Sequence, residues 1–341
     1  MTPRSEAVGR WLGLRWESRR GKGGAIRVLV TGAAGFIGSS LVERLLSRGD
    51  QVVGIDDLCD FYDPARKRAN LADALGHAGF TFVECDIRDA EGLSAITHAR
   101  RLDVVVHLAA RAGVRPSIER PGLYADVNVR GTANVLQLAV AAGARRFVFA
   151  SSSSVYGNTT TYPFHEDDRV NEPISPYAAT KLAGEMLCHT FHHLHGLPIS
   201  CLRFFTVFGP RQRPDLAISL FLSRVGQELP IRVFGDGSTS RDYTFISDIV
   251  AGIEAAMGYD APFRVHNLGN NRPVSLESLI GTVEAVTGRR AIIDRLPLQS
   301  GDMLRTCADI SRATTELAYE PAVTLEHGMA RQWEWMQAGI E

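Results

Sequence analysis

The segment YAATK, residues 177–181, places a tyrosine and a lysine four positions apart. On a helix, two residues with this spacing share one face. A free tyrosine has a pKa of about 10 and is a poor base at neutral pH, but nearby positive charge favours its phenolate form. The pair therefore predicts a proton-transfer site in which Tyr177 is the base or acid and Lys181 tunes it. Because this spacing is common on helices, the prediction needs support from elsewhere in the chain.

Four consecutive serines, residues 151–154, follow the apolar run FVFA, with no carboxylate among them. Ser152 is the candidate to hydrogen-bond the oxygen from which Tyr177 takes a proton. A serine hydroxyl is too weak a base to remove a carbon-bound proton unaided, so these side chains are expected to bind and orient a ligand. Alternatively, Ser151 and Ser154 satisfy backbone groups at the end of a strand.

The segment TGAAGFIG, residues 31–38, carries Gly32, Gly35 and Gly38 between a predicted strand and a predicted helix. Glycines in this context let the backbone approach a pyrophosphate, and the N-terminus of the helix favours its negative charge. Asp56 ends the next predicted strand, 24 residues after Gly32. A carboxylate there accepts hydrogen bonds from the adenosine ribose and repels a 2′-phosphate, which predicts NAD rather than NADP. The alternative is a glycine turn with a solvent-exposed aspartate.

Six short apolar runs alternate with helical patterns in the first 205 residues. The predicted strands are 26–32, 51–57, 80–86, 103–110, 145–152 and 197–205, and the predicted helices are 36–49, 64–76, 123–142 and 176–195. This rhythm predicts an α/β fold with a Rossmann-type, doubly wound parallel sheet. We expect residues 25–200 to form mainly the NAD-binding domain. Residues 201–341 are expected to form mainly a smaller C-terminal substrate-binding lobe, with a strand at 231–234, helices at 275–287 and 323–337, and some segments returning to the first domain.

The composition narrows the class of protein. The net charge of the 341 residues is −1, which argues against a nucleic-acid or anionic-membrane binder. The five cysteines are scattered, which favours reduced thiols and a cytoplasmic location. No apolar run is long enough to span a membrane. Residues 1–24 are basic and glycine-rich, without a signal-peptide pattern, and are expected to be a disordered extension. The spacing of His189 and His193 suits a metal pair but lacks an acidic third ligand, so no metal site is predicted.

Several ordered motifs together carry a family resemblance. These are TGAAGFIG, Asp56, HLAA at 107–110, Ser152, YAATK, LRFFTVFGPRQRPD at 202–215 and RDYTFISDIV at 241–250. The chain, over about residues 26–337, resembles the extended short-chain dehydrogenase/reductases of the nucleotide-sugar epimerase and dehydratase group. The resemblance implies NAD that stays bound through the cycle, a UDP-sugar substrate and a homodimer built on two helices from each subunit. The expected cofactor-binding residues are Gly32, Gly35, Phe36, Ile37, Gly38, Asp56, Asp57, Asp86, Ile87, Leu108, Ala109, Ala110, Asn128, Tyr177 and Lys181.

The serine run decides which reaction of the group is expected. The 4,6-dehydratases carry an Asp-Glu pair where this chain has Ser153 and Ser154, and those acids remove the C5 proton and protonate the leaving group. Hydroxyls in their place favour 4-epimerisation through a transient 4-keto sugar. The run FFTVFGPRQRPD is similar to that of epimerases that act on UDP-glucuronate, and Thr206 replaces the asparagine usual in epimerases of neutral hexoses.

The predicted reaction is therefore conversion of UDP-glucuronate to UDP-galacturonate, with Ser153, Ser154 and Thr206 restraining the sugar carboxylate. By resemblance, Arg241 is expected at the diphosphate and Asp302 at the uridine ribose or a neighbouring turn. Surface ion pairs or solvated loop charges are the alternatives for the charged residues. UDP-glucose or UDP-N-acetylglucosamine, a 4,6-dehydratase and a non-catalytic NAD sensor remain alternative functions. The expected substrate-binding residues are Arg115, Ser153, Ser154, Tyr177, Phe205, Thr206, Arg213, Val233, Phe234, Arg241 and Asp302.

Overall fold

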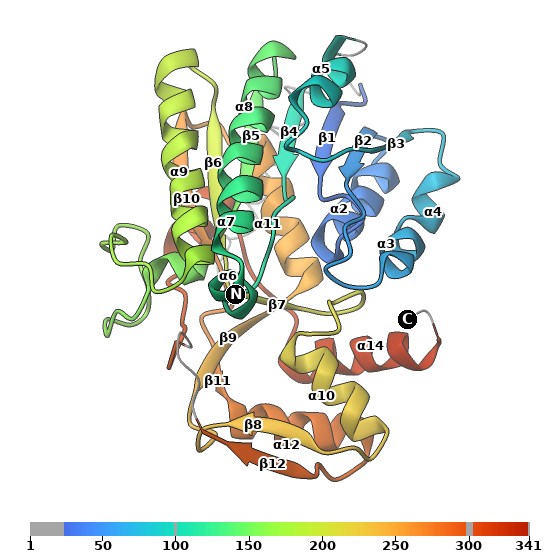
Figure 1. Cartoon of the computed structure of the whole chain (residues 1–341), viewed down its shortest axis with the longest axis vertical. Helices are drawn as coiled ribbons and strands as arrows, with labels where there is room; N and C mark the ends of the chain where they lie inside the picture. The colour runs from blue at the N-terminus through green and yellow to red at the C-terminus, as the bar shows by residue number, and fades with distance from the viewer. Residues whose placement is uncertain (1–23, 99–100, 298–302, 340–341) are drawn as a thin grey trace, which may run out of the picture.

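A seven-stranded sheet, in which every pair of neighbouring strands is parallel, forms the centre of the protein (Figure 1). The computed structural model describes residues 24–98, 101–297 and 303–339. The strand order is β10-β6-β5-β4-β1-β2-β3. The strands are β1 (Arg27–Thr31), β2 (Gln51–Asp56), β3 (Phe80–Glu84), β4 (Val104–His107), β5 (Arg146–Ser152), β6 (Ile199–Phe204) and β10 (Phe263–Leu268). The predicted α/β fold with a parallel Rossmann-type sheet is confirmed.

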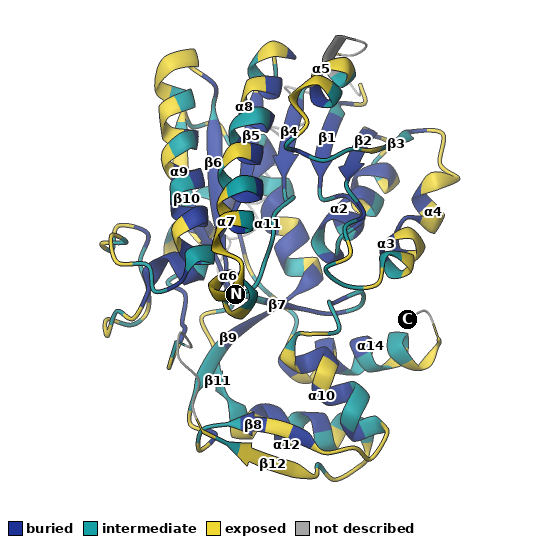
Figure 2. Ribbon diagram, viewed as in Figure 1, coloured by how far each residue is buried: buried dark blue, intermediate teal, exposed yellow. Residues whose placement is uncertain are grey.

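Helices cover both faces of this sheet (Figure 1). In β1, Val28 and Val30 belong to one apolar core and Leu29 to the other, as expected because successive side chains of a strand point to opposite faces. The first core includes residues of α2 and α11, and the second includes residues of α5, α8 and α9. The central strands are accordingly buried along most of their length (Figure 2). The helices are α2 (Phe36–Ser47), α3 (Pro64–Asn70), α4 (Ala72–Leu75), α5 (Ala90–His98), α6 (Val114–Glu119), α7 (Pro121–Ala125), α8 (Gly131–Ala141), α9 (Pro176–His195) and α11 (Ile246–Gly258).

The long helix expected at 123–142 is interrupted. A π-helical turn, Asp126–Arg130, separates α7 from α8. Such turns are frequent at functional sites. Here the turn contains Asn128, which is buried.

The helix that carries the Tyr-Lys pair is bounded by strong local signals. The Ser175 side chain accepts a hydrogen bond from the Ala178 amide at the N-terminus of α9, and Pro176 occupies the first turn. Gly196 ends the helix in the left-handed conformation. The observed helix, Pro176–His195, coincides with the predicted one.

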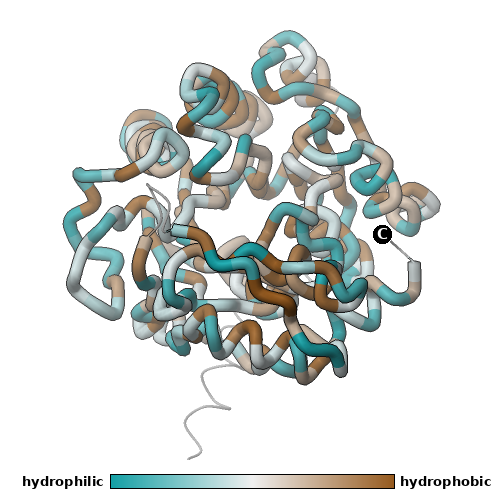
Figure 3. Tube along the Cα trace, turned by 60° about the horizontal axis from the view of Figure 1, so that its bottom comes forward, coloured by the Kyte–Doolittle hydropathy of each residue, from teal (hydrophilic) through white to brown (hydrophobic). Residues whose placement is uncertain are grey.

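The chain after β6 forms most of a smaller lobe below the sheet (Figure 1). Two small sheets, in the orders β11-β9-β7 and β12-β8, pack with three helices there. Figure 3 brings this lobe forward and shows hydrophobic and hydrophilic residues alternating along its chain. β10 returns to the edge of the main sheet beside β6. The elements after β6, apart from β10 and α11, are β7 (Thr206–Phe208), α10 (Ala217–Gly226), β8 (Ile231–Phe234), β9 (Ser240–Phe245), β11 (Pro273–Ser275), α12 (Leu276–Thr287), β12 (Ile293–Leu296), α13 (Ser311–Leu317) and α14 (Leu325–Gln337). Of these, α13 packs on β10.

Among the described residues, no helix combines the length and apolar character that a bilayer crossing would require.

Candidate active site

A cavity of about 480 Å³ opens at the carboxyl ends of the central strands. It lies where β1 pairs with β2 on one side and with β4 on the other, which is the point at which the strand order reverses. Ligands of open α/β sheets bind at such a point. Segments of both halves of the chain line the cavity, from Gly32 in the first half to Leu216 in the second.

The glycine turn after β1 fits a dinucleotide pyrophosphate. Gly32 has φ +70°, and a Cβ there would lie 2.8 Å from the Ala109 amide nitrogen. A Cβ on Gly38 would lie 2.0 Å from the Gly32 carbonyl oxygen, so neither position accepts a side chain without backbone movement. Gly35 is the N-cap of α2 and provides no capping side chain, and it lines the cavity with Phe36, Ile37 and Gly38. The first-turn amides of α2 are therefore available to an anion.

Asp56 ends β2 beside this turn and is buried. Its carboxylate accepts hydrogen bonds from the backbone amides of Ala34 at 3.1 Å and Leu58 at 2.9 Å. Burial raises the pKa of Asp56, and the ammonium of Lys67, 3.6 Å away, opposes that shift. The carboxylate is thus fixed at the cavity wall beside the glycine turn.

The remaining residues expected at the cofactor lie in three places. Asp57, Asp86 and Ile87 follow β2 and β3, and Leu108, Ala109 and Ala110 follow β4; all six line the cavity. A hydrogen bond from Arg88 lowers the pKa of Asp86.

Asn128 does not line the cavity but lies behind its wall. Its amide accepts a hydrogen bond from the Arg111 backbone amide at 2.7 Å and donates to Thr180 of α9 at 3.0 Å. Asn128 therefore joins the loop after β4 to the helix that carries Tyr177 and Lys181.

Tyr177 and Lys181 both reach the cavity from α9. Lys181 is buried, and its Nζ donates to the Ala150 carbonyl oxygen at 2.7 Å. Burial lowers the pKa of Lys181 to about 8. Burial also raises the pKa of Tyr177, and a hydrogen bond with Ser152 and the charge of Arg213 oppose that shift. The sequence predicts that Lys181 and the nicotinamide ring of bound NAD together favour the phenolate; in the protein alone, the effect of burial on the pKa of Tyr177 outweighs those of Ser152 and Arg213.

The serine run lies at the end of β5 and forms the wall opposite the cofactor turn. The Ser152 Oγ accepts a hydrogen bond from the Ser154 hydroxyl at 2.8 Å and caps the following 3₁₀ turn, Ser153–Tyr156. Ser153, Ser154, Phe205 and Thr206 line the cavity together with Ser152. Two segments about 50 residues apart in the sequence, Ser152–Ser154 and Thr206, thus contribute hydroxyl groups to one cavity.

The expected substrate-binding residues do not all reach this cavity. Arg213 lines it, forms a bidentate ion pair with Asp215 and lies over the Phe61 ring. Arg115 lies over the Phe234 ring, 4.7 Å from its centre, outside the cavity lining. Val233 packs in the core of the smaller lobe.

Arg241 also lies outside the cavity lining and donates to the Ser240 carbonyl oxygen within the smaller lobe. Asp302 lies outside the described residues.

Sequence reasoning missed several residues of the wall. They are Cys59, Phe61, Tyr62 and Lys67 after β2, Cys85 after β3, Arg111 to Val114 after β4, Val127 in the π-helical turn, Ala150 and Ser151 of β5, and Phe204, Val207 and Leu216 in the second half. Most belong to loops without a fixed motif. Lys67 carried a usable signal, because a lysine close after a predicted ribose-binding aspartate can pair with it.

The chain belongs to the NAD dependent epimerase/dehydratase family, which it matches over residues 28–269. The glycine turn, the ribose-side aspartate and the Tyr-Lys pair described above are the parts that such a family requires for its cofactor and its proton transfer.

Individual relatives are similar over nearly the whole chain. A UDP-glucuronate 4-epimerase of Thermodesulfobacterium geofontis is 42% identical, over 92% of this chain and 97% of its own length. The structure of a UDP-glucuronic acid 4-epimerase from Bacillus cereus, in complex with UDP-glucuronic acid and NAD, superimposes with a TM-score of 0.87 at 36% identity, covering 92% of this chain and 99% of that one. A UDP-glucose 4-epimerase from Thermotoga maritima, with UDP-glucose, has a TM-score of 0.86 at 30% identity and covers 93% and 100%.

Proposed function

We propose that the protein interconverts UDP-glucuronate and UDP-galacturonate by NAD-dependent epimerisation at C4. One observation carries this choice of reaction. Among the described residues that line the cavity, the acidic side chains are Asp56, Asp57 and Asp86, all after β2 or β3 at the cofactor end. The sugar end presents Ser152, Ser153, Ser154 and Thr206 instead. A site with this distribution can oxidise a sugar alcohol but has no carboxylate to remove the C5 proton.

In the proposed reaction, Tyr177 takes the proton of the C4 hydroxyl. Ser152 holds the same oxygen, consistent with its hydrogen bond to Tyr177. Bound NAD supplies the acceptor, and later the donor, of the hydride at C4. Lys181 contributes positive charge next to the phenolate. Reversal of the steps on the opposite face of the turned 4-keto sugar completes the epimerisation.

The substrate's carboxylate must be held out of the geometry for decarboxylation. A 4-keto glucuronate is a β-keto acid, and it loses CO₂ when its C5–C6 bond aligns with the carbonyl π system. Ser153, Ser154 and Thr206 line the cavity, and their hydroxyls are the proposed donors to the carboxylate, that of Ser154 after it turns away from Ser152. We assign the diphosphate and uridine to the smaller lobe, with Arg213, Arg115 and Arg241 as candidate cationic contacts.

Incubation of the purified protein with UDP-glucuronate tests the proposal. NMR of the products should show UDP-galacturonate, with no net change in NAD. Formation of UDP-pentose and CO₂ would show that the protein is a decarboxylase instead. Formation of a 6-deoxy-4-keto sugar from UDP-glucose would show that it is a dehydratase instead.

UDP-glucose is the second candidate substrate, because a 30% identical epimerase with the same fold is known with UDP-glucose. Thr206 at the sugar wall favours the charged sugar. Parallel assays with both nucleotide sugars distinguish the two, and turnover of the uncharged sugar alone would reject UDP-glucuronate.

We also propose a cytoplasmic homodimer that associates through α8 and α9. The supporting observation is that α9 exposes two large apolar side chains, Met186 by 60% and Leu194 by 66%, which a partner helix could cover. Light scattering should give twice the chain mass, and Met186→Glu should shift the protein towards a monomer. A wild-type monomer at micromolar concentration would reject the dimer. Residues 25–200 are proposed as mainly the cofactor part and residues 201–341 as mainly the substrate part, with some segments, such as β10, returning to the first.

A further inference from the structure

A buried ion pair lies directly behind the catalytic end of β5. Arg203 of β6 donates to both carboxylate oxygens of Glu185 of α9, at 2.9 Å and 2.8 Å. The exposed fractions of Glu185 and Arg203 are 6% and 3%. Burial of two charges is costly and is a weak source of stability, so such a pair calls for another explanation of its presence.

The pair is joined to the catalytic groups on both sides. Tyr177, Lys181 and Glu185 follow one another at four-residue intervals along α9 and so share one face. Lys181 donates to the Ala150 carbonyl oxygen, and the Ser151 hydroxyl donates to Glu185 at 2.5 Å. Two successive residues of β5 are thus tied to α9 immediately before Ser152.

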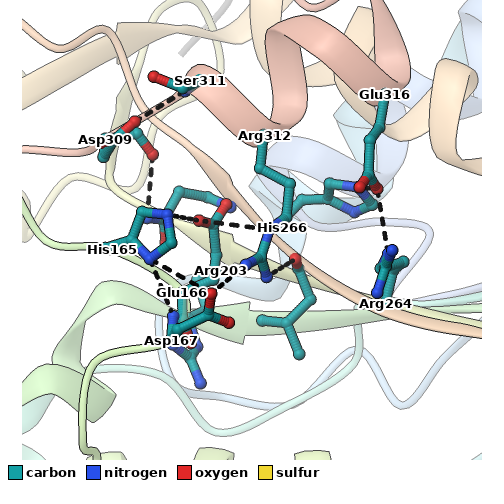
Figure 4. Close-up of polar contacts among 12 residues, drawn as sticks. His165, Glu166, Asp167, Arg203, Arg264, His266, Asp309, Ser311, Arg312 and Glu316 are labelled. Atoms are coloured by element: carbon teal, nitrogen blue, oxygen red, sulfur yellow. Dashed lines mark hydrogen bonds and ion pairs between the residues drawn. The ribbon is translucent and has the colours of Figure 1, made fainter.

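Arg203 is itself held from several directions. It lies over the Tyr156 ring, 4.8 Å from its centre, and donates to the Glu166 carbonyl oxygen at 3.3 Å. Glu166 in turn accepts a hydrogen bond from the Asn267 amide of β10. Figure 4 shows Arg203 beside Glu166 in this region of dense polar contacts, with Arg312 on α13 close by. The carboxylate of Glu185 therefore has little freedom to move.

We propose that Glu185, clamped by Arg203, is a positioning residue for the proposed C4 chemistry. It fixes the end of β5 through Ser151, so that Ser152 keeps its place opposite Tyr177, and it places a negative charge two turns from Tyr177 on the face that carries Lys181. This role rests on the proposed function. Glu185 does not line the cavity.

The charge environment gives this role a signature in the pH dependence. Lys181 faces Glu185 and Cys188 on its own helix, and its ammonium also acts on His107 of β4. Tyr177 faces Arg213, Ser152 and Tyr124, and Arg203 and Cys201 adjoin Glu185 from β6. Burial has the largest effect on the pKa of Lys181 and lowers it, while Cys188 and, to a smaller extent, the anion of Glu185 raise it. Its removal should lower that pKa further, so that Lys181 loses its proton at lower pH.

Glu185→Gln, which keeps the shape and removes the charge, is the primary test. We expect kcat to fall about 10- to 100-fold with KM changed by less than about 3-fold, since small misplacements of reacting groups have effects of this size. The alkaline limb of the kcat profile should move to lower pH.

Ser151→Ala keeps the ion pair, and we expect about a 10-fold loss of kcat with the alkaline limb unmoved. Ser200→Ala is the matched control, because Ser200 is a buried β6 hydroxyl bonded to Arg146 away from the cavity, and it should leave kcat unchanged.

The double variant Glu185→Gln/Arg203→Met separates positioning from folding. Removal of both charges should restore the melting temperature towards wild type, because no unpaired buried charge remains, yet kcat should stay low. A purely structural pair predicts that kcat recovers with the melting temperature, and that outcome overturns the proposal. An unshifted pH limb in Glu185→Gln, or full activity in Ser151→Ala, also overturns it. If wild type converts no UDP-sugar at all, the proposed function fails instead.

Discussion

The two ends of the cavity are built on different principles. At the cofactor end, the backbone does most of the work: Gly32 and Gly38 have no room for a side chain, and Asp56 is fixed by two backbone amides. At the sugar end, side-chain hydroxyls from β5 and β7 define the space, and they are held by tertiary contacts such as those of Lys181 with β5. The first end is a general dinucleotide cradle. We propose that the second end determines which sugar reacts and how.

Loss of the proton-transfer group should have the largest effect. Tyr177→Phe removes only the phenolic oxygen, and we expect kcat to fall by about 10³-fold or more. A positioned acid–base group typically contributes about 10²- to 10⁴-fold to the rate. UDP binding, measured by calorimetry, should stay within a few-fold of wild type. Retention of full activity would mean that another group is the base. The division of the cavity into a cofactor end and a sugar end would then lose its support.

Alkaline pH should lower turnover through Lys181. The pKa of Lys181 is about 8, so the ammonium is present below that pH and is lost as the pH rises through it. We expect kcat to fall about 10-fold for each pH unit well above the pKa. A profile of kcat from pH 6 to 10 measures this limb.

Lys181→Arg sharpens the test, since a guanidinium keeps its proton above pH 12. Its kcat should be lower than that of wild type but flat across the alkaline range. A wild-type profile without any decline to pH 10 would contradict the assigned pKa.

Asp56→Asn should affect the cofactor end alone. The substitution removes the negative charge but keeps the shape, and we expect NAD affinity to fall about 10-fold, equivalent to about 1.4 kcal/mol. Affinity for NADP should rise relative to NAD because Lys67 then faces the site without its carboxylate partner. Fluorescence titration with both cofactors measures the ratio. Product identity should not change, and an altered product spectrum would show that the two ends are not independent.

Thr206→Ala should affect the sugar end alone and produce the smallest change. Loss of one hydroxyl donor loosens the carboxylate, so the ratio of CO₂ released to epimer formed should rise a few-fold, in line with about 1 kcal/mol for one hydrogen bond. Isotope-labelled UDP-glucuronate gives this ratio directly. Thr161→Ala, at an exposed hydroxyl outside the cavity lining, is a suitable control. An unchanged ratio would mean that Thr206 does not restrain the carboxylate.

The difference between the two ends of the cavity also explains how much of the fold and of the site could be predicted from the sequence. The strands β1 to β6 and the helix α9 were predictable because each combines apolar periodicity with a local stop signal, as Ser175 and Gly196 show for α9. The glycine turn and Asp56 were predictable because their spacing is fixed within one βαβ unit. The placement of β10 beside β6 was not, because nothing in Phe263–Leu268 encodes its partner.

Tertiary contacts also decide the parts of the site that were missed. Phe61, which was missed, meets the expected Arg213 at the cavity although more than 150 residues separate them. Ser151 was weighed as a strand-end hydroxyl for backbone groups, whereas its oxygen bonds to Glu185. Burial raises the pKa of Tyr177 in the protein alone, an effect that no local motif records.

The position of β10 has a practical consequence for dissection of the molecule. A fragment that stops at residue 200 is cut inside β6 and leaves β5 paired with β4 alone, so the edge of Arg146–Ser152 that faced β6 is unpaired, in a strand that carries Phe147 and Phe149. Open, apolar edges of this kind recruit other chains. The amino-terminal part alone should therefore self-associate when expressed, and studies of cofactor binding require the intact polypeptide.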